Sequence, residues 1–284
     1  MSGGLLRAGK DRLQRALEPA AARAARRYVA GTELEDALRL CRALDARGTR
    51  STIGYWNDPT DPVSLVDAQY LACLDALGGS DLDGYLSVKV PALRFDPDLL
   101  HPLLRRAAAG GVRVHFDSLG PEHADRTWQV LETASAHHPD LGCTLPGRWR
   151  RSVEDVDRAV AGHWRVRIVK GQWEDPDAQG LDPREGYLEV AKRLAGRAHH
   201  VAVATHDVAL AERVVGVLQA ARTPCELELL HGLPMRAARR LARRRRLPLR
   251  VYVPYGASWL PYTMDVVRRN PRILGWMLLD RMGF

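Results

Sequence analysis

From residue 51 onward, short β-rich runs alternate strictly with longer helical patterns, and this rhythm constrains the fold more than any other feature of the chain. The expected strands are Ser51–Trp56, Tyr85–Val90, Val112–Phe116, Leu141–Leu145, Val166–Lys170, His200–Ala204, Glu226–Leu230 and Leu249–Val253. The expected helices are Val63–Leu77, Pro97–Ala109, Glu122–His137, Val153–His163, Arg184–Ala195, Val208–Ala221, Pro234–Arg244 and Ser258–Asp280. Such alternation predicts a parallel sheet with helical crossovers, and eight strands are the number that closes a (β/α)8, or TIM-type, barrel.

An open, doubly wound sheet is the alternative architecture. Such sheets usually have fewer strands and a glycine-rich first turn that binds a nucleotide, but the chain contains neither GxGxxG nor GxxxxGK[ST]. The length of 284 residues also suits one α/β barrel, which typically takes ~250 residues. We therefore expect an α/β protein built on a single barrel.

An amino-terminal helical extension is expected before the barrel. Residues 5–30 place Leu and Ala against Arg at helical spacing, with a break at Pro19 and an end at Gly31. A capping-box spacing at residues 32–35 predicts a further helix that runs to Gly48. The expected division is residues 1–50 as helices packed on the barrel and residues 51–284 as the barrel. Membrane attachment of the extension is the less favoured alternative.

Composition excludes several classes of protein. The net charge is +8, but the basic residues are spread over many helices, so nucleic-acid binding is not expected. The 4 cysteines lie far apart without a CxxC pair, which predicts buried free thiols rather than a zinc site or disulfides. Neither an apolar run near the ~20 residues of a membrane span nor a signal-peptide core is present. We expect a cytoplasmic protein, at most peripheral to a membrane.

In a barrel of this type, catalytic residues lie at the carboxyl ends of the strands and in the loops after them. The sequence places the following candidates there: Lys89, His115, Asp117, Arg148, Arg167, Lys170, Thr205, His206, Asp207, Glu226, Glu228, His231, Tyr252 and Tyr255. Convergent basic residues suit a ligand with phosphates or an electron-accepting ring, and a metal site is not expected. Two other interpretations stay open: solvated Arg167 and Lys170 at a strand edge, and a retaining glycosidase that uses Glu226 and Glu228.

Five ordered motifs resemble the proline dehydrogenase family over nearly the whole chain. They are Lys89 on the second strand, Arg167-Ile-Val-Lys170-Gly171 on the fifth, Ala204-Thr205-His206-Asp207 on the sixth, Glu226-Leu-Glu-Leu-Leu-His-Gly232 on the seventh and Val251-Tyr-Val-Pro-Tyr-Gly256 on the eighth. The resemblance implies a distorted (β/α)8 barrel that holds FAD non-covalently at the carboxyl ends of its strands. It also implies hydride transfer from the carbon beside the proline nitrogen to the flavin, which leaves an imine.

The resemblance assigns roles residue by residue. It implies catalytic roles for Lys89, Arg167 and Tyr252. It implies cofactor contacts from Arg167, Val169, Lys170, Gly171, Trp173, Thr205, His206 and Glu228. The substrate pocket would contain Lys89, His115, Leu230, Tyr252, Tyr262, Asp265 and Arg268. A cation beside the flavin would stabilise the negative charge that accumulates as hydride arrives.

Departures from the family pattern concentrate in the substrate pocket. Asp265 and Val266 stand where the family has an arginine pair that clamps the proline carboxylate, and Arg268 lies one turn later. His115 stands where the family has an aspartate that partners the lysine, with Asp117 two residues on, and Glu228 replaces a glutamine near the flavin. A carboxylate near the flavin would disfavour its reduced anion unless a neighbouring cation compensates.

These departures favour a modified or non-proline amine as the substrate, with free proline held by Arg268 as the alternative. The electron acceptor is expected to be a quinone or oxygen. A flavin-dependent reductase of folate or nicotinamide type, and an inactive flavin-binding or partner protein, remain alternatives. The Arg-rich seventh helix is interpreted as a solvated face, with a membrane or partner surface as the alternative.

Overall fold

The structure is a computed structural model, and it describes residues 29–256. The strands form a closed, all-parallel barrel in the order β1 to β8, which β1 closes by pairing with β8. Their bounds are β1 Arg50–Tyr55, β2 Gly84–Val88, β3 Arg113–Phe116, β4 Leu141–Pro146, β5 Arg165–Val169, β6 His200–Ala204, β7 Cys225–Leu230 and β8 Leu249–Tyr255. The predicted (β/α)8 barrel is therefore confirmed.

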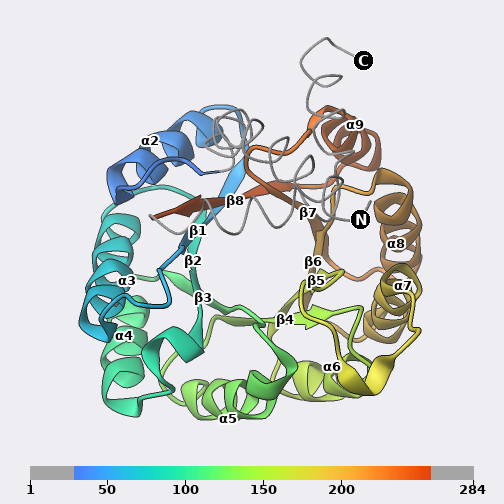
Figure 1. Ribbon diagram of the computed structural model, residues 1–284. Coiled ribbons are helices and arrows are strands. Elements are labelled where there is room, and N and C mark those ends of the chain that lie inside the picture. The colour runs from blue at the N-terminus through green and yellow to red at the C-terminus, as the bar shows by residue number, and fades with distance from the viewer. Residues whose placement is uncertain (1–28, 257–284) are drawn as a thin grey trace, which may run out of the picture.

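A ring of helices surrounds the barrel (Figure 1). The helices are α2 Leu34–Asp45, α3 Val63–Gly78, α4 Pro97–Ala109, α5 Ala124–Ala134, α6 Ser152–Ala161, α7 Pro183–Leu194, α8 Val208–Ala220 and α9 Arg236–Arg245, with short 3-10 turns η2 Val90–Leu93, η3 Pro121–His123 and η4 Pro176–Ala178. Helix α2 lies before the barrel in sequence and contacts β1 and β8. Among the described residues, no helix is both long and apolar enough to span a membrane.

Each strand divides its side chains between two environments. On β5, Val166 and Ile168 join the apolar layer between sheet and helices, whereas Arg167 reaches acceptors on other strands across the barrel interior. Alternation of side chains along a strand produces this division. The apolar core therefore lies outside the barrel, and the barrel interior is polar and charged.

The amino-terminal ends of the strands carry an ion-pair network that we call the barrel floor. Arg250 is fully buried and donates from Nε to Glu226 Oε1 at 2.8 Å, from Nη1 to the Ser51 carbonyl at 2.7 Å and from Nη2 to Asp83 Oδ1 at 3.2 Å. Arg50 also contacts both carboxylates, at 2.9 Å and 3.3 Å. Glu226 is thus occupied at the floor, far from the strand ends where a glycosidase would need it.

Several predicted boundaries move by a few residues for local reasons. Strand β2 ends before Lys89, because Pro91 lacks the N–H that a strand ladder needs and the 3-10 turn η2 begins at Val90. Strand β8 runs two residues beyond the predicted Val253 to Tyr255. The four cysteines are free and buried, as predicted. The predicted helices over residues 5–30 and Ser258–Asp280 fall almost wholly outside the described residues.

Candidate active site

Arg167 on β5 is the cation at the centre of the barrel interior. Its Nε donates to Glu228 Oε2 at 2.8 Å, and its Nη2 donates to Glu228 Oε1 at 2.9 Å, so the pair is bidentate. Its Nη1 donates to Asp117 Oδ1 at 2.6 Å and to Ser87 Oγ at 3.4 Å. Burial opposes the charge of Arg167, but the two carboxylates together keep its pKa well above the usual value.

Glu228 on β7 is a buried carboxylate with every oxygen engaged. Besides the two bonds from Arg167, Oε1 accepts from Thr52 Oγ1 at 2.9 Å and Oε2 accepts from the Tyr85 hydroxyl at 3.4 Å. A buried carboxylate is costly unless it is paired and hydrogen-bonded. Arg167 is therefore the neighbouring cation that compensates the negative charge of Glu228.

Asp117, which follows β3, links the interior to the carboxyl ends of the strands, which we call the barrel mouth. Its Oδ1 accepts from Arg167, and its Oδ2 accepts from the Tyr252 hydroxyl at 3.2 Å. The Arg167 guanidinium also lies over the Tyr252 ring, 5.3 Å from its centroid. Three strands thus bring an acid, a cation and a phenol together at the mouth.

Lys89 lies at the same mouth, directly after β2. Its Nζ donates to the Tyr55 carbonyl at 3.0 Å and lies 5.9 Å from the centroid of the Trp56 ring. Its backbone N–H donates to the Tyr70 hydroxyl at 3.1 Å. Burial lowers the pKa of Lys89 to about 8, and the charge of Asp117 opposes this shift. An amine with such a pKa exchanges a proton readily near neutral pH.

Gly54 on β1 makes room for Tyr252. A Cβ on Gly54 would overlap the Tyr252 hydroxyl, so any larger residue would push the phenol away from Asp117. The glycine is therefore required by the close approach of a side chain from the neighbouring strand.

A second charged group forms between the ends of β5 and β6. Lys170 Nζ donates to Asp207 Oδ2 at 2.9 Å, and Arg184 approaches the same oxygen at 3.3 Å. Burial alone would raise the pKa of Asp207, but the hydrogen bonds from Lys170 and the Leu210 N–H bring it below its usual value. The Thr205 hydroxyl accepts from the Asp207 N–H at 3.1 Å. Lys170 thus remains at the mouth as a partly exposed cation.

His206 ties the ends of β6 and β7 together. Its Nε2 accepts from the Leu230 N–H at 2.9 Å, which leaves Nδ1 as the donor to the Pro234 carbonyl at 3.0 Å. Both ring nitrogens of the neutral imidazole are therefore engaged by backbone groups. This arrangement fixes the position of Leu230 at the mouth.

The loop after β5 presents an aromatic surface. Gly171 has φ of +94°, a conformation that favours glycine, and the chain then turns so that Trp173 is 39% exposed. Trp149 Nε1 donates to the Trp173 carbonyl at 3.0 Å, and Arg148 Nη1 donates to the Gln172 carbonyl at 3.3 Å. The loop is thus held by residues that follow β4.

His115, which was expected in the substrate pocket, is almost fully buried on β3. Its Nε2 is 2.8 Å from Thr144 Oγ1, and burial, reinforced by the charge of Arg167, holds its pKa well below the usual value. The residue whose charge acts on Lys89 is Asp117, two positions further along the chain. Asp117 stood among the strand-end candidates, but the sequence did not indicate that it would bridge Arg167 and Tyr252.

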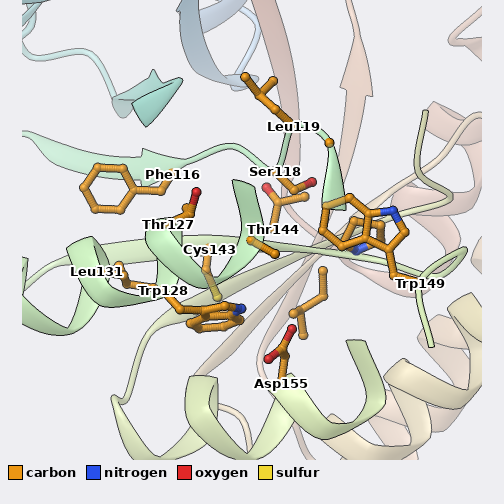
Figure 2. Close-up of a pocket in the computed structure, with 14 residues that line it drawn as sticks. Phe116, Ser118, Leu119, Thr127, Trp128, Leu131, Cys143, Thr144, Trp149 and Asp155 are labelled. Carbon is orange, nitrogen blue, oxygen red and sulfur yellow. The ribbon is translucent and has the colours of Figure 1, made fainter. Parts of the chain in front are cut away.

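Three predicted substrate residues, Tyr262, Asp265 and Arg268, lie outside the described residues. Figure 2 shows a cavity beside the mouth, lined by side chains from β3, β4, α5 and α6 that include Cys143 and Trp128. Its volume of about 20 Å³ is that of one water molecule, so it is a packing void rather than a substrate pocket. Within residues 29–256, no group of three or more His, Cys, Asp or Glu side chains could hold a metal ion.

Comparisons with known proteins give one consistent family name, although no family model matches the chain. Over 272 residues the chain is 26% identical to proline dehydrogenase 1 of Bacillus subtilis strain 168, covering 89% of each protein. It is 23% identical over 274 residues to proline dehydrogenase of Deinococcus radiodurans, covering 87% of this chain and 86% of that protein.

Among solved structures, the fold is similar to proline utilization A (PutA) from Bdellovibrio bacteriovorus inactivated by N-propargylglycine. The TM-score is 0.75 at 18% identity, and the match covers 87% of this chain. The chain spans only 32% of that PutA chain. This likeness concerns the fold, and it agrees with the closed barrel described above.

Proposed function

We propose a specific reaction for this chain, which is a divergent member of the proline dehydrogenase family and thus an oxidoreductase that acts on CH–NH groups. The reaction is FAD-dependent transfer of a hydride from a carbon next to an amine nitrogen, which yields an imine. The observation that carries the proposal is the contact of Arg167, Asp117 and Tyr252 beside Lys89 at the barrel mouth.

The residues at the mouth suit FAD by their chemistry. Lys170 offers a partly exposed cation, and Trp173 offers an exposed planar ring on the loop that begins at Gly171. A cation, an aromatic face and a glycine without a side chain suit a planar cofactor that carries phosphates. We assign the flavin ring to Arg167, Val169, Lys170, Gly171, Trp173 and Glu228, and the ribityl and phosphate region to Thr205 and His206. When bound, FAD supplies the two-electron acceptor that the side chains lack.

The proton chemistry is assigned to Lys89. Neutral Lys89 Nζ would accept one proton from an ammonium substrate, which frees the nitrogen lone pair to form the C=N bond when the neighbouring carbon loses hydride. The product would be a protonated imine, which becomes the imine when its N–H proton passes to solvent. Lys89 suits this role because its lowered pKa of about 8 leaves part of the population neutral near pH 8. Tyr252 and Leu230 orient the donor carbon. Arg167 offsets part of the charge of Glu228 and Asp117, which would otherwise oppose the negative charge that arrives with the hydride.

The preferred substrate is a modified or non-proline amine rather than free proline. The Nε and both Nη groups of Arg167 already donate hydrogen bonds to Glu228, Asp117 and Ser87. Lys89 Nζ donates to a backbone carbonyl. At the inner mouth, the described residues thus offer little for a substrate carboxylate. Asp265, which replaces part of the family's carboxylate clamp, would repel such a group and attract a cationic one.

The test is anaerobic absorbance spectroscopy of the FAD-loaded protein with a panel of amines. We expect proline esters or amides, diamines or N-substituted amines to bleach the flavin at lower concentration than proline. If the protein retains no flavin absorbance after incubation with FAD and removal of unbound FAD, every flavin-dependent activity is excluded. Reduction by NAD(P)H, without reduction by any amine, would instead favour a reductase on the same barrel.

A single variant tests the substrate assignment separately. Asp265→Arg restores one arm of the carboxylate clamp, so the concentration of proline that half-saturates bleaching should fall. Val266→Arg, at the adjacent position, provides the second arm for comparison. If the unmodified protein already saturates with proline as readily as with its ester, the assignment of a non-proline substrate is wrong.

The acceptor that reoxidises the flavin is proposed to be a quinone or oxygen. Monitoring flavin reoxidation after substrate is exhausted, with air or with a soluble quinone in separate experiments, distinguishes the two.

A further inference from the structure

Helices α4 and α5 are neighbours in the helical ring (Figure 1). A second cavity lies between them. Its volume is about 200 Å³, and its apolar wall is formed by Phe95, Leu100, Leu104 and Val130. For comparison, a cavity of ~150 Å³ in another protein is enough to hold benzene. The α4–α5 cavity therefore has room for one aromatic ring with a small head group.

Arg126 on α5 gives this cavity an unpaired cation. Its guanidinium carbon lies 4.0 Å from the centroid of the Phe95 ring, and within residues 29–256 it makes neither a hydrogen bond nor an ion pair. The acids on α5 do not neutralise it. Asp125 accepts from Arg151, the residue before α6, and Glu132 accepts from Arg158 of α6, both at 2.7 Å. The five N–H donors of Arg126 are thus available to an anion.

His101 on α4 supplies a second polar group in the lining. Its ring stacks on that of His137, with centroids 4.5 Å apart, and the side chain is half-buried. Because His101 and Arg126 both line the cavity, the imidazole N–H adds a donor from the opposite helix. The polar groups therefore come from both helices, while the apolar wall lies between them.

The backbone that carries Phe95 adopts an unusual conformation. Arg94 and Phe95 have φ of 55° and 58°, a left-handed region that side chains other than glycine rarely occupy. Successive residues of this kind persist only where the surroundings over-determine them, and they cluster at ligand sites. Here the pair carries the Phe95 ring to the face of Arg126.

From these observations we propose that the α4–α5 cavity binds a small aromatic monocarboxylate. Arg126 takes the carboxylate, His101 contributes a second donor, and the ring of the ligand lies against Phe95 and the aliphatic wall. The proposal does not depend on the reaction proposed for the barrel mouth, because none of these residues belongs to it.

The test is isothermal titration of the full chain with benzoate. We expect one saturable site whose affinity falls with added NaCl. Arg126→Met should weaken binding at least about tenfold, the scale of one charge-assisted hydrogen bond. The matched control is Arg105→Met, which removes an exposed arginine of α4 outside the cavity and should leave affinity unchanged. Benzyl alcohol, which has the ring without the charge, should bind at least about tenfold more weakly.

Two further variants locate the site. Val130→Phe fills the cavity and should abolish binding while the circular dichroism spectrum stays native. Lys89→Met should leave benzoate affinity unchanged, because Lys89 belongs to the barrel mouth. The proposal is overturned if benzoate does not saturate, if Arg126→Met binds like the unmodified protein, or if Lys89→Met abolishes binding.

Discussion

Arg167 and Glu228 form a bidentate ion pair that crosses the barrel interior from β5 to β7, with both side chains almost fully buried. The cost of burying these charges is met only while both partners are present, because each compensates the other. Arg167 also donates to a second carboxylate, that of Asp117, and Asp117 in turn accepts from the Tyr252 hydroxyl. The position of Arg167 is therefore linked to that of Tyr252. Stability and site geometry therefore depend on the same guanidinium.

Removing the Glu228 carboxylate should be strongly destabilising. We expect Glu228→Ala to lower the free energy of unfolding by about 3–5 kcal/mol, because it leaves Arg167 buried with Asp117 as its remaining acid. Glu228→Gln should cost less, since the amide keeps the shape and a hydrogen bond. Urea unfolding measures both.

The control for this loss is Glu189→Gln, which removes a carboxylate from the exposed pair with Lys192. It should change stability by at most about 1 kcal/mol. If Glu228→Ala lowers the free energy of unfolding no more than the control does, the buried pair contributes little to stability.

The pH dependence of activity should report Lys89. Because the neutral amine accepts the substrate proton, kcat/KM should rise with pH through about 8, the pKa to which burial lowers this lysine. Lys89→Met should lose most of the activity together with this inflection. A steady-state profile from pH 6 to 10, with an amine substrate of higher pKa, provides the measurement.

Asp117→Asn tests the sign of the same effect. Asp117 raises the pKa of Lys89 against the effect of burial, so its removal should shift the inflection to lower pH. An inflection that moves to higher pH, or stays in place, would show that another group is titrating.

Gly54→Ala should displace Tyr252. The added Cβ overlaps the phenol hydroxyl, so we expect a loss of about 1–3 kcal/mol in stability and about 10- to 100-fold in kcat/KM. Tyr252→Phe in the Gly54→Ala background should recover part of the stability, because it removes the nearest overlapping atom. Thermal unfolding and steady-state rates are the readouts.

Gly216→Ala on α8 is the matched control, because a Cβ there meets no atom within 4 Å. It should leave kcat/KM unchanged and raise stability by up to about 1 kcal/mol, the helix preference for Ala over Gly. Equal effects of the two substitutions on activity would contradict the close approach of Tyr252 to Gly54.

The barrel could be predicted from sequence because its signal is periodic and local. On β5, Val166 and Ile168 alternate with Arg165 and Arg167, and the same two-residue period marks the other strands. Boundaries failed where one residue overrode the pattern, as Pro91 does after β2. The alternation along a strand and the effect of a proline both depend on residues that are close in the chain, and this is why sequence reasoning reaches them.

The pairing of charges could not be predicted, because it depends on which side chains face each other across the barrel. Arg167 and Lys170 look alike in the sequence, but Arg167 is buried against Glu228 and Lys170 is partly exposed beside Asp207. Glu228 lies 61 residues from Arg167 along the chain. The distant partner decides which arginine or lysine is solvated.

His206 should stabilise the barrel mouth through its two backbone contacts. His206→Ala leaves the Leu230 N–H and the Pro234 carbonyl without this partner, so we expect the free energy of unfolding to fall by about 2 kcal/mol. This value is at the low end for two buried groups that lose a hydrogen bond, because water reaches this half-buried site. The control is His199→Ala, which removes an exposed imidazole that stacks on His163. Its free energy of unfolding should stay within about 0.5 kcal/mol of that of the unmodified protein. Hydrogen exchange at the Leu230 amide should accelerate in His206→Ala and remain unchanged in His199→Ala. Unchanged protection in both variants would show that the imidazole does not hold this strand end.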